Sequence, residues 1–418
     1  MSQNNTSTFL LGDDLSASPS PLIRPSPSSP HVLVIGGGVT GLTTAWFLLD
    51  RGYRVTIISK KWATHTSSQR LTSQIAGALW ELPPAGCGPQ AVQDKLDMVQ
   101  KWALESLRVY QTMVSNKELA AAFGVKINLC TSFHTNKIKD DIVKSKKMDL
   151  VLSSKLPGFQ WNLQELLSKY NANPKSHGGL HDAYEHVAPV IDTDVAISFL
   201  LRLVRAKGAT LVTDTISTSL QDIEPHLLRA YNASAIVNAT GSAALQTASD
   251  ESVYPLRGAV LRVINDGSDF PRITNSFLVS TESRPDGNFR DVAFIVPRND
   301  NILILGSIAQ PNQWQFDLTP ESPEIKDMRK RCEDLLPVLK KARLDPSYPL
   351  AQGARPYRKG NVRVEREGSK AKSSRIIHAY GHGGAGWSLA FGSGRECLRL
   401  VKELHAELEG GLEISARL

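Results

Sequence analysis

The chain has 418 residues, of which 41% are hydrophobic, and this is enough for two domains or for one large α/β unit with an inserted domain. Its 48 basic and 41 acidic residues give a net charge of +7, which favours an anionic substrate, but no stripe of Lys and Arg alternates with aromatic residues, so nucleic-acid binding is not indicated. No apolar run reaches the roughly 18 residues of a membrane span, and no signal peptide is evident, so we expect neither a membrane span nor secretion.

The N-terminal stretch, residues 1–30, is rich in Ser and Pro (SASPSPLIRPSPSSP). A segment of this composition buries too little apolar surface to offset its ordering entropy, so we expect a solvated tail. Cys87, Cys130, Cys332 and Cys397 lack the spacing of a disulfide framework or a metal site. We therefore expect buried thiols in a reducing compartment and no bound metal.

The most specific pattern lies between His31 and Lys61 and predicts a strand, a glycine turn, a helix and a second parallel strand. The apolar run VLVI is followed at once by Gly36, Gly38 and Gly41 in G-x-G-x-x-G spacing. The first glycine permits the tight turn, the second lets the backbone approach a pyrophosphate, and the third lets the helix pack closely. Free N–H groups and a positive dipole end at the helix N-terminus would face the phosphates, which predicts dinucleotide binding.

The residues after the second strand depart from most dinucleotide sites. An acidic residue about 20 positions on usually accepts hydrogen bonds from the ribose, whereas this chain has Ser59, Lys60 and Lys61. Because two lysines could bind a ribose phosphate, an NADP-dependent enzyme is an alternative at this point.

A Thr- and Ser-rich loop (THTSSQRLTSQ) and a run of small residues (IAGALW) come next. Hydroxyls and backbone N–H groups of the loop could hold phosphate, and Ala76, Gly77 and Ala78 would let a planar ring come close. An ordinary polar loop in front of a buried Trp80 explains the pattern equally well.

Later segments predict a parallel α/β sheet joined to an antiparallel one. Helical spacing predicts helices over 92–114 and 196–207, and apolar runs predict strands at 210–213 and 235–238. The less regular stretch 117–185 indicates the start of an inserted domain. Further strands, predicted at 259–263, 292–296 and 302–308, suggest an antiparallel sheet in a second domain, with a helix at 335–342.

An arginine-rich stretch, GARPYRKGNVRVERE, contains Arg355, Arg358 and Arg363. The planar, permanently charged guanidinium suits a carboxylate held bidentately. For any single arginine, however, a surface ion pair with Glu365 or Glu367 is the simpler explanation.

A glycine-rich turn, AYGHGGAGWSLAFGSG, follows a strand predicted at 375–378 and enters a final helix that extends through Arg399. This is a second helix N-terminus aimed at electron-rich atoms. His382 could act as a base, but an exposed or backbone-bonded histidine is the simpler interpretation.

Taken in chain order, these motifs resemble those of the FAD-dependent D-amino acid oxidases, and the likeness extends over residues 31 to about 405. The motifs at 353–365 and 378–386 distinguish that family from flavoproteins that share only the glycine fingerprint and the Ala-Thr-Gly sequence at 239–241. The matching stretches are the fingerprint at 36–41, IAGALW at 75–80, VNATG at 237–241, LRG at 256–258, GSIAQPNQW at 306–314, GARPYRKGNVRVE at 353–365 and HAYGHGGAG at 378–386.

The resemblance implies an α/β fold, with a Rossmann-like FAD-binding domain and a second α+β substrate domain built on an antiparallel sheet. The FAD-binding domain would comprise 31–90, 185–250 and 351–408, the substrate domain 91–184 and 251–350, and a C-terminal tail 409–418.

FAD is the cofactor that the resemblance implies. The dipole of the helix that follows Gly383 to Gly386 would stabilise the negative charge of the reduced ring. The implied cofactor-binding residues are Gly36, Gly38, Val39, Thr40, Gly41, Lys60, Ser67, Ser68, Gly77, Ala78, Leu79, Gly241, Gly383, Gly384, Ala385, Gly386, Trp387 and Ser388.

The resemblance also implies a reaction. Arg355 would bind the carboxylate of an amino acid or amine substrate, and the carbonyl of Gly384 would accept its amine. Hydride transfer from Cα to flavin N5 depends more on positioning than on a protein base. The imino acid would hydrolyse to a keto acid and ammonia, and O2 would reoxidise the flavin and form hydrogen peroxide.

Two positions depart from the family and bear on the substrate. Phe294 replaces a tyrosine that helps to bind the carboxylate, and Arg290 replaces another tyrosine, where an arginine could bind a second acid group. We therefore expect an acidic, N-substituted or otherwise unusual amino acid. Alternatives are an oxidase of a cyclic or secondary amine in specialised metabolism, a flavin-binding protein without activity, and the NADP-dependent reductase, which the motifs around Arg355 and Gly384 oppose.

The chain ends in Ala416, Arg417 and Leu418, a small-basic-Leu pattern similar to the peroxisomal address S-K-L. This pattern predicts recognition by the peroxisomal import receptor and a peroxisomal location, with the cytoplasm as the alternative.

Overall fold

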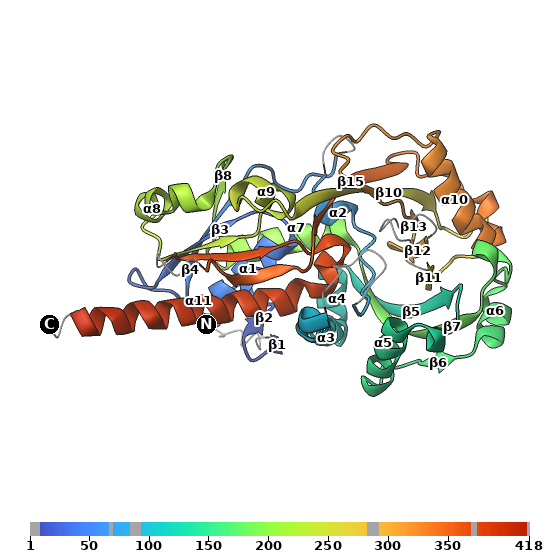
Figure 1. Cartoon of the computed structure of the whole chain (residues 1–418), viewed down its shortest axis with the longest axis horizontal. Coiled ribbons are helices and arrows are strands. Elements are labelled where there is room, and N and C mark those ends of the chain that lie inside the picture. The colour runs from blue at the N-terminus through green and yellow to red at the C-terminus, as the bar shows by residue number, and fades with distance from the viewer. Residues whose placement is uncertain (1–8, 67–69, 84–92, 282–291, 369–373, 416–418) are drawn as a thin grey trace, which may run out of the picture.

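The computed structural model describes residues 9–66, 70–83, 93–281, 292–368 and 374–415. Two β-sheets lie beside each other along the longest axis of the molecule, each with helices of its own (Figure 1). The first is a six-stranded sheet and the second is a nine-stranded sheet. The mixed α/β class predicted from the sequence is confirmed.

The six-stranded sheet is parallel except at one edge, where β16 and β17 run antiparallel. Buried apolar runs form its central strands, because both faces are covered by helices. The strand order is β16-β17-β9-β3-β4-β8. The strands are β3 (His31–Ile35), β4 (Arg54–Ser59), β8 (Thr210–Thr213), β9 (Ala235–Asn238), β16 (Arg363–Arg366) and β17 (Ile376–Tyr380).

The long helix α11 extends beside this sheet to the C-terminal end of the described chain (Figure 1). It continues to Ser415 and therefore includes most of the stretch from 409 predicted as a tail. The helices near this sheet are α1 (Val39–Asp50), α2 (Thr72–Ile75), α3 (Gln93–Val114), α4 (Lys117–Phe123), α7 (Thr193–Ala206), α8 (Leu220–Ala230), α9 (Ala244–Thr247) and α11 (Gly386–Ser415).

Helix α3 packs mainly beside the six-stranded sheet. The sequence assigned it to the substrate domain, but it packs against α11. The Tyr110 hydroxyl donates to the carbonyl O of Trp387 at 2.9 Å, and Ser106 Oγ accepts a hydrogen bond from the backbone N–H of Gly392 at 3.1 Å. A methyl group at Gly392 would overlap the backbone of Trp102, so the two helices touch through their backbones.

The nine-stranded sheet is antiparallel apart from the parallel pair β5 and β11, which confirms the antiparallel sheet predicted from the alternating runs. Its order is β14-β10-β13-β12-β11-β5-β7-β6, with β15 paired to β10. The strands are β5 (Val125–His134), β6 (Gln160–Trp161), β7 (Asp182–Ile191), β10 (Val253–Ile264), β11 (Ser276–Ser280), β12 (Ala293–Pro297), β13 (Ile302–Gly306), β14 (Gln310–Pro311) and β15 (Leu350–Arg358).

Two strands continue across boundaries that were predicted from the sequence. Strand β7 continues past 185 to Ile191, and β15, predicted in the FAD-binding domain, pairs with β10 along its whole length. The predicted boundaries at 185 and 351 therefore fall inside β7 and β15. Helices α5 (Ile142–Ser153), α6 (Leu163–Tyr170) and α10 (Pro323–Leu335) accompany this sheet, and the helix predicted at 335–342 is a short 3-10 helix, Pro337–Lys341.

The solvated tail predicted for residues 1–30 is wrong from residue 9 onwards. Strands β1 (Leu10–Gly12) and β2 (Leu15–Ser16) form a small hairpin in which Leu15 is fully buried. The carboxylate of Asp50 accepts the backbone N–H groups of Ser16 and Leu22 at 2.8 and 3.0 Å, and Lys207 binds Asp50 at 2.6 Å in a fully buried ion pair. Polar groups of the folded body therefore hold a segment that has little apolar surface of its own.

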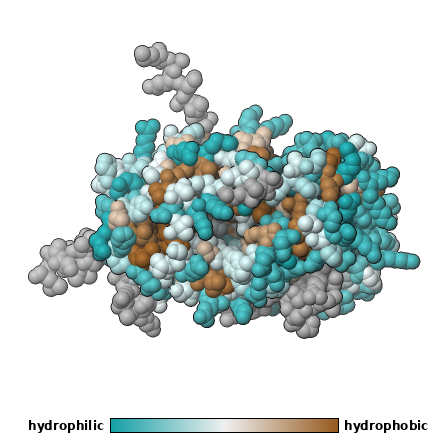
Figure 2. All heavy atoms as spheres, turned by 90° about the horizontal axis from the view of Figure 1, so that it is seen from above, coloured by the Kyte–Doolittle hydropathy of each residue, from teal (hydrophilic) through white to brown (hydrophobic). Residues whose placement is uncertain are grey.

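The surface carries its exposed hydrophobic residues in separate patches among hydrophilic ones on the face seen in Figure 2. None of the helices in the described ranges has both the length and the apolar character needed to cross a membrane. Cys130, Cys332 and Cys397 are buried free thiols, as predicted, and burial raises the pKa of Cys332 to about 11; Cys87 lies outside the described residues.

Candidate active site

A cavity of about 710 Å³ lies where the two sheets meet, and residues from both line it. On one side are the carboxyl ends of β3, β4 and β9, which is where open α/β sheets bind ligands. Every predicted cofactor-binding residue within the described ranges lines the cavity, with the exception of Gly41. Ser67 and Ser68 lie outside the described residues.

The glycine fingerprint is held by close backbone contacts. Gly36 has φ +125°, and a methyl group on it would overlap the carbonyl O of Ala239. A methyl group on Gly41 would overlap the carbonyl O of Gly36, which explains why Gly41 serves helix packing and does not face the cavity. The turn and the close packing predicted from the sequence are therefore confirmed.

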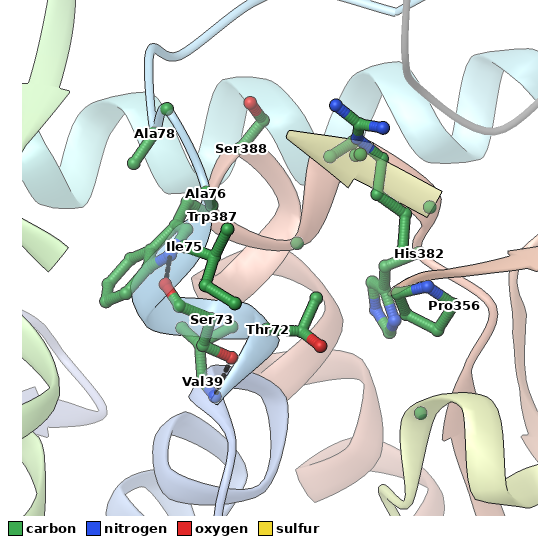
Figure 3. A pocket seen from close by; sticks show the side chains of 18 of the residues that line it. Val39, Thr72, Ser73, Ile75, Ala76, Ala78, Pro356, His382, Trp387 and Ser388 are labelled. Atoms are coloured by element: carbon green, nitrogen blue, oxygen red, sulfur yellow. Dashed lines mark hydrogen bonds between the residues drawn. The ribbon is translucent and has the colours of Figure 1, made fainter. Parts of the chain in front are cut away.

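Ser73 links the fingerprint to the last helix of the chain (Figure 3). Its Oγ accepts the backbone N–H of Val39 at 3.0 Å, and its carbonyl O accepts the Trp387 indole N–H at 2.8 Å. Figure 3 shows Pro356 and His382 on the other side of the cavity. The sequence analysis did not single out Ser73, because a serine in a Ser- and Thr-rich loop has no distinctive spacing.

The end of β4 is cationic, and its acidic residue comes from a neighbouring strand. Lys60 and Lys61 line the cavity beside Ser59, whose Oγ donates to the carbonyl O of Lys61 at 2.7 Å. Asp214 also lines the cavity here, and its backbone N–H donates to the Ser59 carbonyl at 3.2 Å. An acidic residue therefore stands directly after β8, the parallel neighbour of β4, at the same edge of the sheet.

The small-residue run forms an isolated antiparallel bridge with β7, in which Leu79 pairs with Val190. The N–H of Trp80 donates to the carbonyl O of Pro189 at 2.8 Å, and Ala78 accepts from the N–H of Ile191 at 3.0 Å. A methyl group on Gly77 would overlap the ring of Phe294 from the other sheet. This stretch is therefore an ordered wall of the cavity, where the backbone of Gly77 lies against the ring of Phe294.

The buried side chain of Arg298 holds this wall in place through hydrogen bonds. The sequence did not indicate this role. The guanidinium donates to the carbonyl O of Ala76, to that of Ile191 at 3.0 Å and to Thr193 Oγ1 at 2.7 Å. Burial lowers the pKa of Arg298 to about 10, which leaves it charged at neutral pH.

Arg355 is separated from the other two arginines of its motif. Arg363 binds Glu365 at 3.0 Å, which is the ion pair expected from the sequence, whereas Arg358 forms its ion pair with Asp250 at 2.7 Å and not with Glu365 or Glu367. The Arg355 side chain lines the cavity instead, directly over Gly258, where a methyl group would overlap the guanidinium.

The oxygen atoms that hold Arg355 come from the end of β13. Its guanidinium donates to the carbonyl O of Ile308 at 3.0 Å and to Ser307 Oγ. Ser307 is buried and also lines the cavity, next to the arginine. Sequence reasoning named Arg355 but not Ser307, because their contact joins residues 48 positions apart.

The glycine-rich turn forms another wall of the cavity. A 3-10 helix, Gly383–Ala385, leads into α11, and Gly384 is exposed where it lines the cavity. His382 is buried, with Nε2 3.2 Å from Ser393 Oγ, and burial lowers its pKa to about 4. His382 is therefore a neutral, buried histidine. The sequence had suggested an exposed or backbone-bonded histidine, and that interpretation is wrong.

Two groups of predicted residues remain to be accounted for. Phe294 lines the cavity, as described, whereas Arg290 and the terminal residues Ala416, Arg417 and Leu418 lie outside the described residues. A polar wall that the sequence did not indicate lies at the far end of the cavity and comprises Glu81, Ser132, His134, Lys147 and Tyr184.

Known proteins match this chain over most of its length, including the residues that line the cavity. Residues 31–400 match the sequence profile of a family described as FAD dependent oxidoreductase. A D-amino-acid oxidase from Rubrobacter xylanophilus is 28% identical over 373 residues, which is 89% of this chain and 95% of the relative. A D-amino-acid oxidase from Streptomyces coelicolor is 32% identical over 377 residues, which is 89% of this chain and 96% of the relative.

Solved structures show the same fold at low sequence identity. Glycine oxidase from Bacillus cereus superposes with a TM-score of 0.66 at 18% identity, covering 90% of this chain and 95% of the other. An L-alpha-glycerophosphate oxidase from Mycoplasma pneumoniae with FAD bound has a TM-score of 0.62 at 14% identity, covering 90% and 95%.

Proposed function

This chain belongs to the FAD-dependent oxidoreductase family, and from this premise we propose that it oxidises an amino acid at Cα, with Arg355 as the group that binds the substrate carboxylate. The observation that carries the proposal is the Arg355 guanidinium. It faces a cavity whose other walls are the glycine fingerprint and the Gly383–Ala385 turn.

FAD is the cofactor, and the residues present fit it. Gly36 and Gly77 line the cavity without side chains, and a methyl group on either would overlap neighbouring protein atoms, so larger residues have no room there. The N-terminus of α1 would take the pyrophosphate. Lys60 and Asp214 would contact the ribose and its neighbouring phosphate. Bound FAD would supply the electron acceptor for a hydride, that is two electrons and one proton, from the substrate Cα; the same two electrons, with that proton and a second one from the substrate amine or solvent, would reduce O2 to hydrogen peroxide.

The protein residues would bind and orient the substrate. A guanidinium that keeps N–H groups toward the cavity can bind a carboxylate bidentately. The Gly384 carbonyl would accept an N–H of the substrate amine and so direct Cα. His382 is neutral, buried and engaged with Ser393, which makes it unsuitable as a base. The rate would then depend on positioning, as expected for direct hydride transfer.

The relatives named as D-amino-acid oxidases support a D-amino acid as substrate. The imino acid product would take up water and release ammonia to give a keto acid. The absent hydroxyl at Phe294 favours a second candidate, the oxidation of an N-substituted or cyclic amine, because the carboxylate has fewer partners there. A peroxisomal location, through recognition of Ala416, Arg417 and Leu418 by the import receptor, suits an enzyme that produces peroxide.

A coupled peroxide assay on the purified protein tests the proposal, with the visible spectrum recorded beforehand. The panel comprises D- and L-amino acids, N-methyl amino acids and cyclic amines. We expect flavin bands, and peroxide from amino acids. A colourless protein would support the NADP-dependent alternative, and flavin bands without peroxide from any compound would support a non-catalytic flavin-binding protein.

A further inference from the structure

The wall formed by the small-residue run contains one residue in a strained backbone conformation. Ala78 has φ +52°, in the left-handed region that a residue with a side chain rarely adopts. Glycine would adopt this conformation without strain, yet the position is occupied by alanine. Ala78 is buried and lines the cavity (Figure 3). A residue strained in this way persists only where its surroundings hold it, so the contacts of this wall bear on its function.

Arg298 holds the wall on both sides of Gly77. The N–H of Ile191 donates to the carbonyl O of Ala78 at 3.0 Å, and the carbonyl O of Ile191 accepts from the Arg298 guanidinium at 3.0 Å. The same guanidinium donates to the carbonyl O of Ala76. One side chain therefore supports the wall at Ala76 directly and at Ala78 through Ile191.

The third acceptor of Arg298 extends this support to the end of helix α2. Thr193 Oγ1 accepts from the guanidinium at 2.7 Å and donates to the carbonyl O of Gln74 at 2.5 Å. Arg298 is only 5% exposed and does not line the cavity, so it acts on the wall from the protein interior. Its three acceptors are uncharged oxygen atoms, and hydrogen bonds from a charged donor to such atoms are stronger than those between neutral groups.

Strand β12 contacts the wall at a second place. Arg298 comes directly after this strand, and Phe294 lies within it. The Phe294 ring is so close to Gly77 that a methyl group there would overlap it. One strand of the nine-stranded sheet therefore supports the wall through a ring that lines the cavity and through a cation that does not.

We propose that Arg298 is a positioning residue for the flavin, because it holds Ala78 in the strained conformation in which the wall accepts the cofactor. Without the guanidinium, the carbonyl groups of Ala76 and Ile191 lose a donor, and Ala78 relaxes toward an ordinary backbone conformation. FAD binding then has to restore the strained conformation, which lowers the affinity. The kinetic consequences of this inference rest on the proposed function, whereas the effect on FAD affinity does not.

The affinity of the full-length holoenzyme for FAD measures this role. Dilution of the holoenzyme releases FAD, whose fluorescence rises when it leaves the protein, and a dilution series gives Kd. In Arg298→Met we expect Kd to rise about 10- to 100-fold, because buried carbonyl groups lose a charged donor. Arg298→Lys keeps the charge but lacks the planar fork, so it should raise Kd less than Arg298→Met does.

A second substitution separates positioning from general support of the fold. Because glycine adopts the left-handed conformation without strain, Ala78→Gly in the Arg298→Met background should recover about 3- to 10-fold of the lost affinity. In the wild-type background, where Ala78 is already held, Ala78→Gly should change Kd by less than about 3-fold. If Arg298→Met does not fold, the same comparison is made in the Arg298→Lys background.

Arg329→Met is the matched control. Arg329 also donates to a backbone carbonyl, that of Ala342 at 2.8 Å, but it does not line the cavity. This variant should keep the wild-type Kd. An unchanged Kd in both Arg298 variants overturns the proposal. It is also overturned if Ala78→Gly recovers no affinity in the Arg298 variants, because Arg298 would then support the fold in general and not the conformation of Ala78.

The kinetics of the flavin-loaded variant complete the test. At saturating FAD, Arg298→Met should lower kcat about 10-fold and leave KM for the amino acid within about 3-fold, since Arg355 still binds the carboxylate. If the wild-type holoenzyme oxidises no amino acid, the proposed function fails, whereas the comparison of Kd values still decides the role of Arg298.

Discussion

The two sheets build the cavity by different means. The six-stranded sheet presents backbone, and its glycines remove side chains at Gly36 and Gly41 so that chain segments can touch. The nine-stranded sheet presents side chains, among them Val260, Tyr184 and Arg355. The difference shows that cofactor binding depends on where side chains are missing, whereas substrate binding depends on which side chains are present.

If this contrast is right, adding atoms to the glycine turn has the largest effect of any single change. Gly41→Val places a branched side chain against the carbonyl O of Gly36. We expect the variant to purify without flavin and to lose about 3 kcal/mol of stability, since overpacking at backbone cannot be relieved by a side-chain rotation. Flavin absorbance and thermal unfolding measure both effects. Gly410→Ala in α11, where the added methyl group meets open space, should leave flavin content unchanged.

On the other sheet, removal of a single side chain should greatly slow substrate oxidation without loss of the cofactor. Arg355→Ala is expected to retain flavin bands and to lose about 100- to 1,000-fold in kcat/KM, because a charge-assisted carboxylate contact disappears. Steady-state kinetics and the visible spectrum of the same preparation test this. Arg366→Ala, which removes a surface pair with Glu407, is the control. Unchanged kinetics in Arg355→Ala would remove Arg355 from the site.

Low pH should destabilise the part of the molecule around the six-stranded sheet more than the part around the nine-stranded sheet. Burial lowers the pKa of His378 and His382 to about 4 on the first side, and that of His134 to about 3 on the second. Between pH 6.5 and 4 the unfolded chain binds protons that the folded chain does not, so the free energy of unfolding falls as pH falls, by up to about 1.4 kcal/mol per pH unit for each histidine.

Denaturant unfolding between pH 7 and pH 4 measures this slope. In His382→Asn we expect a shallower slope, because one of the buried groups no longer titrates. His226→Gln, an exposed histidine on α8, serves as the control and should keep the wild-type slope. An equal slope in the wild type and in His382→Asn would contradict the prediction.

The smallest expected effect concerns the support of Arg355. Ser307→Ala removes the Oγ that accepts from the guanidinium, at a cost of about 1 kcal/mol for one lost hydrogen bond. We expect KM to rise about 5-fold while kcat changes little, since the arginine keeps its bond to Ile308. A fall in kcat with KM unchanged would show that Ser307 has another role.

The cofactor side could be predicted from the sequence because its signals are local. The turn at Gly36, the helix after it and the strand β4 follow within one short stretch, and each glycine has a function that spacing reveals. Arg355 could be named as a candidate, but only the fold separates it from Arg358 and Arg363, because ion pairing depends on partners such as Asp250, which lies far away in the sequence.

The far end of the cavity could not be predicted, for the same physical reason. Ser132 and Tyr184 face each other across β5 and β7, and Lys147 meets Glu81 from a position 66 residues away. The hydrophobic periodicity of residues 117–185 is weak, so strands β5 and β7 were not predicted from the sequence either. The N-terminal hairpin was missed because its stability depends on Asp50 and Lys207, and not on its own composition.

The most direct measurement mixes the purified protein with amino acids in the absence of O2 and follows the flavin absorbance. We predict that the bands bleach with an amino acid, that bleaching is about 100-fold slower in Arg355→Ala, and that admission of O2 restores the bands and releases hydrogen peroxide. Flavin bands that persist with every amino acid tested would contradict the assignment of this cavity to amino acid oxidation.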